Sequence, residues 1–186
     1  FKQLLDRNPR EIIGVDNDES ELFFLSDRYG GRDNVNMHLC DVRDEANLRV
    51  HAKGTDIILH TAALKHVILC EQAPSQAVQT NIEGVQNVIA AATDAGVERV
   101  LFTSSDKAVN PTSVMGTSKL LGERLITAAA AQDSRDGPVF AATRFGNVLG
   151  SNGSVVPIFA RQIAAGEPIT LTDRAMNRFV MTIDEA

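Results

Sequence analysis

The chain has 186 residues, of which 44% are hydrophobic and 23% charged, and its formal net charge at pH 7 is −6. This composition is typical of one compact globular domain with enough apolar residues for a core. Basic residues are scattered between acidic ones, which argues against binding to a phosphate backbone and hence to nucleic acid. No apolar run approaches the roughly 20 residues that cross a bilayer, so we expect this segment to make no membrane contact.

Short β-branched runs alternate with longer segments of helical period along the chain. The opening segment, "FKQLLDRN", has the pattern of the last turns of a helix. The predicted strands cover residues 11–16, 35–40, 55–62, 98–105 and 138–146, and the predicted helices between them cover residues 19–29, 44–53, 74–95 and 114–132. Continuous apolar runs of this kind are typical of strands buried on both faces of a parallel sheet. The predicted fold class is therefore α/β, a Rossmann-like doubly wound parallel sheet with right-handed crossovers.

The pattern changes after residue 150. A helix is predicted at about 154–165, followed by two short strand-like pieces at 168–172 and 178–182 and a new helix capped by Thr182 or Asp184. The glycine-rich loop that joins the first strand to the first helix of a dinucleotide-binding fold is absent from these residues. We therefore expect a fold truncated at both ends.

The two cysteines, Cys40 and Cys70, lie neither in a C-x-x-C pair nor beside clustered histidines. This spacing disfavours a disulfide framework and a metal site. We therefore expect no bound metal and a cytoplasmic location.

Ligands of open parallel sheets bind beyond the carboxyl ends of the strands, so the residues that end each run are candidates for binding. Asp16 ends the first run, where a dinucleotide fold places an acid that binds the adenosine ribose and repels a 2′-phosphate; alternatively, Asp16 caps the next helix. The second run ends in Asp41 and Val42, which lie beside the adenine or form an ordinary acidic turn. Small Ala62 and Ala63 after the third run would let the backbone approach a ligand.

The fourth run leads into Asp106 and Lys107, which supply an acid and a base at the mouth of the sheet. The helix that follows carries Met115 and Lys119 one turn apart, on one face. A lysine at this position would lie near the nicotinamide ribose. From spacing alone, however, the helical pair also fits the core and solvated edge of an amphipathic helix, and Asp106 with Lys107 fits an exposed ion pair.

The fifth run continues into "RFGNVLGSNGSVVP", residues 144–157, which is rich in glycine and polar amides. Backbone N–H groups freed by the glycines, together with Arg144 and Asn147, could bind a sugar or a diphosphate. The alternative is a long irregular loop packed on the sheet.

The segments "AALKHV", "TNIEGVQNVI", "SSDKAVNPTSVMGTSK", "TRFGNVLGSNGSVVP" and "RFVMTIDEA" occur in this order in one branch of the extended short-chain dehydrogenases. The chain resembles this polysaccharide-biosynthesis (CapD-like) branch, typified by inverting UDP-N-acetylglucosamine 4,6-dehydratases. The resemblance implies an NAD-binding Rossmann-like domain over residues 1–150 and the beginning of a substrate-binding region over residues 151–186. It also implies that the glycine-rich loop precedes residue 1. Met115 occupies a position that usually holds tyrosine, a variant of longer members whose upstream helices attach them to the inner membrane.

The resemblance further implies an internal redox cycle on a UDP-sugar in surface polysaccharide biosynthesis. Hydride leaves C4 for NAD+, the resulting ketone acidifies C5–H, water leaves from C6, and the hydride returns to C6. By match of motif, Lys107 abstracts the C5 proton and Asp106 protonates the departing hydroxyl. A lysine base must be neutral part of the time, which partial burial and the second cation of Lys119 favour. Because Met115 cannot take the C4 hydroxyl proton, Asp106 or an ordered water is expected to accept it.

The remaining site residues follow from the same resemblance. Those expected on the NAD side are Asp16, Asp41, Val42, Ala62, Ala63, Lys65, Asn81, Thr103 and Lys119. Those expected to face the nucleotide sugar are His66, Arg144, Asn147, Ser151, Ser154 and Val155. Asp16 stands where relatives that use NADP carry a Ser-Arg pair, so NAD is the expected cofactor rather than NADP.

Two other functions stay open at this point. A nucleotide-sugar epimerase of the same fold would use the ketone without losing water, although an Asp-Lys pair favours elimination. A catalytically silent binding module for NAD or a nucleotide sugar would explain Met115, but the intact Asp106, Lys107 and Lys119 argue against it. Without a phosphate loop, these residues are expected to show weak or no turnover. The predicted helices at 74–95 and 114–132 could form the four-helix dimer contact common in this superfamily, but their apolar faces would look the same if they only covered the sheet. By the resemblance, the complete protein is expected to be a homo-oligomer.

Overall fold

The structure is a computed structural model that describes residues 1–132, 137–151, 154–171 and 173–186. The strands are β1 (Ile12–Asp16), β2 (Val35–Leu39), β3 (Ile57–His60), β4 (Arg99–Ser105), β5 (Val139–Phe145), β6 (Asn147–Val148) and β7 (Val180–Met181). The helices are α1 (Lys2–Leu5), α2 (Glu19–Tyr29), α3 (Glu45–Ala52), α4 (Val67–Gln72), α5 (Pro74–Val78), α6 (Gly84–Ala95), α7 (Val114–Ala131) and α8 (Val155–Ala164). A π-helical turn, η1, covers Gln79–Glu83, and a 3-10 turn, η2, covers Asp106–Ala108.

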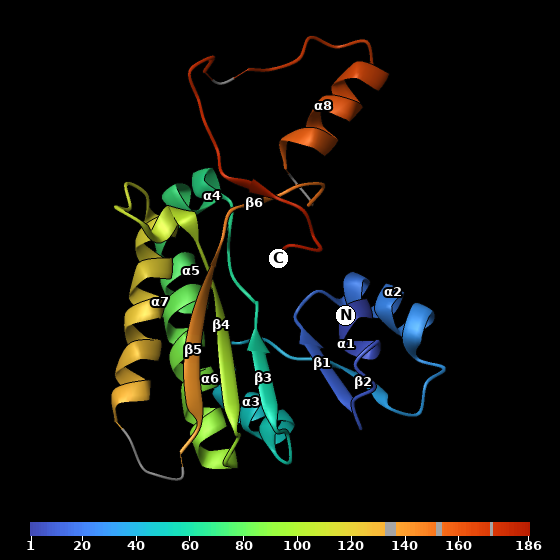
Figure 1. Ribbon diagram of the computed structural model, residues 1–186, viewed down its shortest axis with the longest axis vertical. Coiled ribbons are helices and arrows are strands. Elements are labelled where there is room, and N and C mark those ends of the chain that lie inside the picture. The colour runs from blue at the N-terminus through green and yellow to red at the C-terminus, as the bar shows by residue number, and fades with distance from the viewer. Residues whose placement is uncertain (133–136, 152–153, 172) are drawn as a thin grey trace.

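The strands pair in parallel, which confirms the predicted doubly wound α/β fold. Strand β1 pairs with β2, and β4 lies between β3 and β5. Within the described residues no ladder joins β1 to β3, so the sheet consists of two parallel halves, as Figure 1 shows. The short pair β6–β7 brings the end of the chain back to the carboxyl edge of the three-stranded half.

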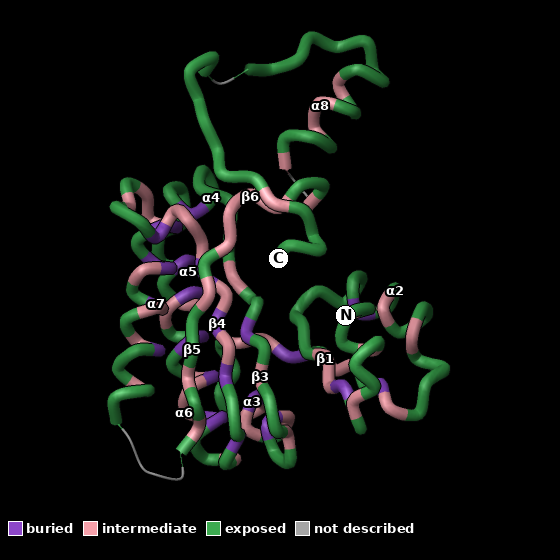
Figure 2. Tube along the Cα trace, in the orientation of Figure 1, coloured by how far each residue is buried: buried purple, intermediate pink, exposed green. Residues whose placement is uncertain are grey.

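The best-packed part of the core lies between the three-stranded half and helices α6 and α7. Val100 and Phe102 alternate with partly exposed residues along β4, and Phe102 packs against Val85 and Ile126. Helix α7 approaches the strand closely at Gly122, where an added Cβ would lie 2.7 Å from the Phe102 ring. Figure 2 shows that buried residues concentrate in this half of the molecule, whereas helix α8 has none. Burying each large apolar side chain contributes about 1.5–3 kcal/mol, so this half supplies the rigid frame for the carboxyl edge.

The structure departs from the sequence prediction at several places. The helix expected over 74–95 is divided into α5 and α6 by the π-helical turn η1. The strand expected at 168–172 is absent from the described residues 168–171, and of 178–182 only Val180–Met181 pairs. The helix expected to open near Thr182 is limited to a capping box, in which Glu185 accepts from the Thr182 N–H at 2.8 Å and donates its own N–H to Thr182 Oγ1 at 3.3 Å.

Candidate active site

Two cavities lie beside the strands and reach their carboxyl ends. The first, of about 500 Å³, lies between the two halves of the sheet. The second, of about 390 Å³, lies among β4, α7 and the β5–β6 segment. Thr61 and Ala63 line both cavities, so the two adjoin beyond the end of β3.

Most of the predicted site residues line one of these cavities. The first is lined by Asp16, Val42, Ala62 and Ala63. The second is lined by Ala63, Lys65, His66, Thr103, Lys107, Met115, Lys119, Asn147, Ser151 and Ser154. Five predicted residues that the structure describes lie outside both linings, namely Asp41, Asn81, Asp106, Arg144 and Val155. Residues 152 and 153 of the predicted sugar-binding loop lie outside the described residues.

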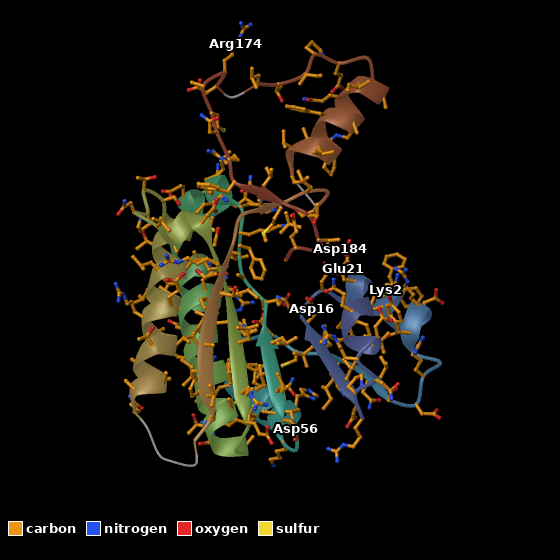
Figure 3. The ribbon with its side chains drawn as sticks, in the orientation of Figure 1. Lys2, Asp16, Glu21, Asp56, Arg174 and Asp184 are labelled. Carbon is orange, nitrogen blue, oxygen red and sulfur yellow. The ribbon has the colours of Figure 1, made fainter. Side chains whose placement is uncertain are left out.

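Asp16 lies at the carboxyl end of β1, on the side that faces β3 (Figure 3). Its Oδ1 accepts a hydrogen bond from the Asp18 N–H at 3.0 Å. Asp18 itself caps α2 by accepting from the N–H groups of Ser20 and Glu21 at 2.9 and 3.1 Å. Because Asp18 serves as the cap, the alternative reading of Asp16 as the helix cap is wrong, and its carboxylate is available at the first cavity.

Asp41 is engaged by its own neighbours. Arg43 donates to both carboxylate oxygens, with the shortest contact at 2.6 Å, and Asn17 donates at 3.3 Å. The hydrogen bonds from Arg43 lower the pKa of Asp41 to about 2, with a smaller contribution from Asn17. Val42 and Arg43, rather than Asp41, therefore form this wall of the first cavity.

Asn81 is 1% exposed and lies in the π-helical turn. Its Oδ1 accepts from the Leu64 N–H at 2.8 Å, and its amide donates to the Leu64 carbonyl and to Ser118 Oγ, both at 2.9 Å. A π-turn inserts one extra residue into a helix and re-aims a side chain, and such turns are common near functional sites. Asn81 thus ties the loop after β3, which carries Lys65, to helix α7.

Lys119 and Met115 lie on one buried face of α7, as predicted. Lys119 is 6% exposed; its Nζ donates to the Thr103 carbonyl at 3.0 Å and lies 4.8 Å above the Phe102 ring. Burial lowers the pKa of Lys119 to about 8. Met115 is 3% exposed and packs against Cys70. The thioether therefore fills a core position while it lines the second cavity.

His60 is a buried residue that sequence reasoning missed. It ends β3, lies 5.6 Å from the Phe102 ring, and lines the first cavity. Burial, and then the charge of Lys119, lower the pKa of His60 to about 4, so the imidazole is neutral at pH 7. Its Nε2 has no hydrogen-bond partner in the described part of the chain. In the sequence, His60 could have been recognised as a candidate because it is a polar residue at the end of an apolar run.

Asp106 and Lys107 form the charged centre of the site. Lys107 Nζ donates to Asp106 Oδ1 at 3.0 Å and to Asn147 Oδ1 at 2.9 Å, and Ser105 Oγ donates to Asp106 Oδ1 at 3.0 Å. Burial acts to raise the pKa of Asp106, but the hydrogen bonds from Lys107 and Ser105 outweigh it, so the pKa lies below its ordinary value. Asp106 is therefore a carboxylate at neutral pH.

Helix α7 lies directly against this charged turn because of Gly116. A Cβ added at Gly116 would come within 3.0 Å of the Lys107 carbonyl oxygen. The glycine in "VMGTSK" is therefore the residue that brings Met115 and Lys119 close to Lys107. Its backbone role was visible in the sequence only as a glycine inside a helical pattern.

Arg144 lies beside α7, outside the lining of both cavities. Its guanidinium donates two hydrogen bonds to the Glu123 carboxylate, at 2.8 and 2.7 Å. The hydrogen bonds from Arg144 hold the pKa of Glu123 below its ordinary value. Glu123 carried no signal in the sequence, because a glutamate on a helix surface is common.

The described residues contain no group of three or more His, Cys, Asp or Glu side chains that could bind a metal ion. Among the helices of the described chain, none is both long and apolar enough to span a bilayer. The site thus offers acid–base groups, a buried lysine and two adjoining cavities.

Known proteins are similar to this chain in sequence and in fold. A UDP-N-acetylglucosamine 4,6-dehydratase (inverting) of Campylobacter jejuni is 38% identical over 186 residues, which are 99% of this chain and 55% of the relative. A UDP-glucose 4-epimerase of Rickettsia bellii is 44% identical over 149 residues, which are 80% of this chain and 44% of the relative. The chain spans about half the length of the curated relatives it matches.

Solved structures agree. Pen from Bacillus thuringiensis has a TM-score of 0.97 at 39% identity, over all of this chain and 59% of that one. A dTDP-glucose 4,6-dehydratase from Streptomyces venezuelae, solved with NAD bound, has a TM-score of 0.87 at 24% identity, over 99% of this chain and 64% of that one, and shows the shared fold.

The family model described as polysaccharide biosynthesis protein matches residues 1–186, the full length of the chain. Together with the motifs and the relative from Campylobacter, this match identifies the chain as a member of the polysaccharide biosynthesis (CapD-like) family.

Proposed function

We propose that the chain forms the catalytic part of an NAD-dependent nucleotide-sugar 4,6-dehydratase that acts on UDP-N-acetylglucosamine and inverts C5. The observation that carries this proposal is the Asp106–Lys107 pair, 3.0 Å apart between Oδ1 and Nζ, in which Lys107 lines the second cavity and Asp106 lies directly behind it. An acid and a base held side by side suit the removal of a proton and of a hydroxyl group from neighbouring carbons. The curated dehydratase of Campylobacter supports the choice of substrate.

The carboxyl end of the first cavity, where Asp16, Ala62 and Ala63 lie, suits the adenosine half of NAD. The Asp16 carboxylate at the end of β1 suits the ribose hydroxyls, and the small Ala62 and Ala63 leave room beyond β3. When bound, NAD+ would supply the hydride acceptor for C4 and the hydride donor for C6. Lys119 at the adjoining cavity would then lie on the nicotinamide side. We assign residues 1–150 to NAD binding and residues 151–186 to the start of the substrate region, since Ser151 and Ser154 line the second cavity.

The protons balance if Asp106 acts in two steps, first as a base toward the C4 hydroxyl and then as an acid toward the C6 hydroxyl. Asp106 is ionised at neutral pH, because its pKa lies below the ordinary value, so it can take the C4 hydroxyl proton that Met115 cannot accept. Lys107, in its neutral form, takes the C5 proton, and Asp106 gives its proton to the C6 hydroxyl as the C6–O bond breaks. The C5 position is finally protonated from the face opposite Lys107 by a solvent water, and Lys107 returns its proton to the solvent. The net change is the loss of one water.

The experiment uses a chain that carries, beside residues 1–186, the flanking segments found in the relatives. The product of incubation with UDP-N-acetylglucosamine and NAD+ is analysed by mass spectrometry, and a mass lower by one water is expected. Lys107→Met should abolish this loss, because general acid–base steps contribute roughly 10²–10⁴ in rate. Lys53→Met, at the end of α3, is the matched control and should retain it. If the protein binds NAD but the mass of UDP-N-acetylglucosamine is unchanged, the proposed dehydratase activity is contradicted.

The second candidate is a nucleotide-sugar 4-epimerase, which the relative from Rickettsia favours. An epimerase would return a product of the same mass with inverted C4, without exchange of the C5 proton. Incubation in heavy water separates the two candidates, because only the dehydratase incorporates deuterium at C5.

A further inference from the structure

We propose that Asn147 is a positioning residue for Lys107, and that its side-chain oxygen holds the Lys107 amine toward the second cavity. The inference rests on the proposed function for its catalytic meaning, since Lys107 is the proposed base. The contact itself can be tested without catalysis.

The direct contact joins two distant segments. Lys107 Nζ donates to Asn147 Oδ1 at 2.9 Å across 40 residues of sequence, and to Asp106 Oδ1, its chain neighbour, at 3.0 Å. A lysine side chain has a flexible four-carbon stem, so a single partner on the same turn leaves much of its freedom. Because Lys107 has donors and no acceptor, the side-chain oxygen of Asn147 must face it. Asn147 therefore fixes the amine relative to β6, while Asp106 moves with the turn itself.

The backbone of Asn147 is held by the end of the chain. Its N–H donates to the Phe179 carbonyl at 2.8 Å, and β6 pairs in parallel with β7. At Gly146 the two segments approach so closely that an added Cβ would lie 2.8 Å from the Phe179 carbonyl oxygen. The position of the Asn147 side chain is thus set by the β6–β7 pair.

Strand β5, which precedes Asn147, is bonded at its end to helix α7. The two hydrogen bonds from Arg144 to Glu123 tie the end of β5 to α7, and Glu123 lies one turn after Lys119. Arg144 also stands beside Ser104 in the β4–β5 ladder. The ladder therefore keeps the strand that leads to Asn147 in register with the strand that leads to Lys107, and the ion pair fastens its end to α7.

This role differs from the predicted role of Asn147 as a ligand of the nucleotide sugar. A residue that only binds substrate leaves Lys107 unchanged when substrate is absent. A positioning residue affects the Lys107 amine in the free protein.

The first test measures the reactivity of Lys107 without substrate, in the chain with the flanking segments of its relatives. Reductive methylation with isotopically labelled formaldehyde is followed at Lys107 by peptide mass spectrometry. In Asn147→Leu the amine is held by Asp106 alone, and its labelling rate should rise about tenfold or more, the effect of losing one hydrogen bond to a charged group. Asn147→Asp keeps an acceptor in the same place and should label no faster than the parent. Asn36→Leu, on β2, is the matched control and should be unchanged.

The second test separates the catalytic steps. In Asn147→Leu, deuterium exchange at C5 of UDP-N-acetylglucosamine should fall by about 10²-fold, because a displaced base loses its alignment. KM and the transient formation of NADH should change by less than about threefold, a small effect beside that loss. Unaltered Lys107 labelling, or an equal loss in exchange and NADH formation with a raised KM, would overturn the positioning role. If the parent chain shows neither exchange nor NADH with this sugar, the proposed function fails, while the labelling ratio still decides the contact.

Discussion

The buried Lys119 should make the stability of the protein depend on pH in a characteristic way. Burial lowers its pKa from 10.5 to about 8 in the folded chain. Between these two pH values the unfolded chain carries a proton on Lys119 and the folded chain does not. The unfolded state therefore binds more protons, and the free energy of unfolding rises with pH across this window.

The size of the effect follows from the two pKa values. The difference between 10.5 and about 8 corresponds to about 3 kcal/mol by which the folded protein favours the neutral amine. Lys119→Met preserves the volume and removes the titration. The free energy of unfolding of the parent relative to Lys119→Met should therefore rise by about 2–3 kcal/mol from pH 7 to pH 10.

The measurement is urea unfolding of both proteins at pH 7, 8, 9 and 10. Other groups that titrate in this range, including Cys40 and Cys70, whose pKa values burial raises, are present in both proteins and cancel in the difference. His60 stays neutral throughout, because its pKa is about 4. A difference that stays flat within about 0.5 kcal/mol would refute a depressed pKa for Lys119.

Two further predictions concern the frame of the site. Gly116→Ala should displace α7 from the Lys107 carbonyl. Its free energy of unfolding, measured in urea, should fall by about 1–2 kcal/mol even after the gain in helix propensity is included. The control Gly31→Ala, whose added Cβ would meet no heavy atom of the described residues within 4 Å beyond its own chain neighbours, should be neutral or slightly stabilising in the same assay. Asn81→Leu removes the bonds to Leu64 and Ser118 and should cost about 2–4 kcal/mol; a cost below about 0.5 kcal/mol would show that Asn81 does not fix the loop after β3.

The sequence predicted the regular part of the fold well, because its physical signals are local. Continuous apolar runs indicated β4 and β5 within one residue at each end, and the run before Asp16 indicated β1. The pattern could not show the π-helical turn at Asn81, since the hydrogen bonds that Asn81 makes there go to Leu64, 17 residues away.

The sequence predicted which residues form the site better than it predicted which of their side chains bond to one another. Spacing placed Met115 and Lys119 on one face, and the family motif singled out Asp106 and Lys107. The partners of the polar groups were hidden, because they come from distant elements: Glu123 engages Arg144, which was expected to face the sugar, and Asn147 engages Lys107. The cofactor and substrate contacts of the predicted residues stay predictions.

The proton of the C4 hydroxyl links Met115, Asp106 and Lys119 in one argument. Met115 holds the position of a proton acceptor and cannot accept a proton, so another group in or beside the second cavity must accept it. At pH 7 Lys119 is mostly protonated, because its pKa is about 8, and an ammonium cannot accept a proton. Asp106 is ionised at the same pH, so it is the expected acceptor.

This assignment predicts how the loss of Asp106 should depend on pH. In Asp106→Asn, transient NADH formation from UDP-N-acetylglucosamine should fall by about 10²-fold or more at pH 7. It should then recover as pH rises through about 8, because the neutral amine of Lys119 becomes able to accept the C4 hydroxyl proton. The double variant Asp106→Asn with Lys119→Met should lack this recovery. Formation of NADH that survives Asp106→Asn unchanged at pH 7 would show that the proton leaves by another route, such as an ordered water.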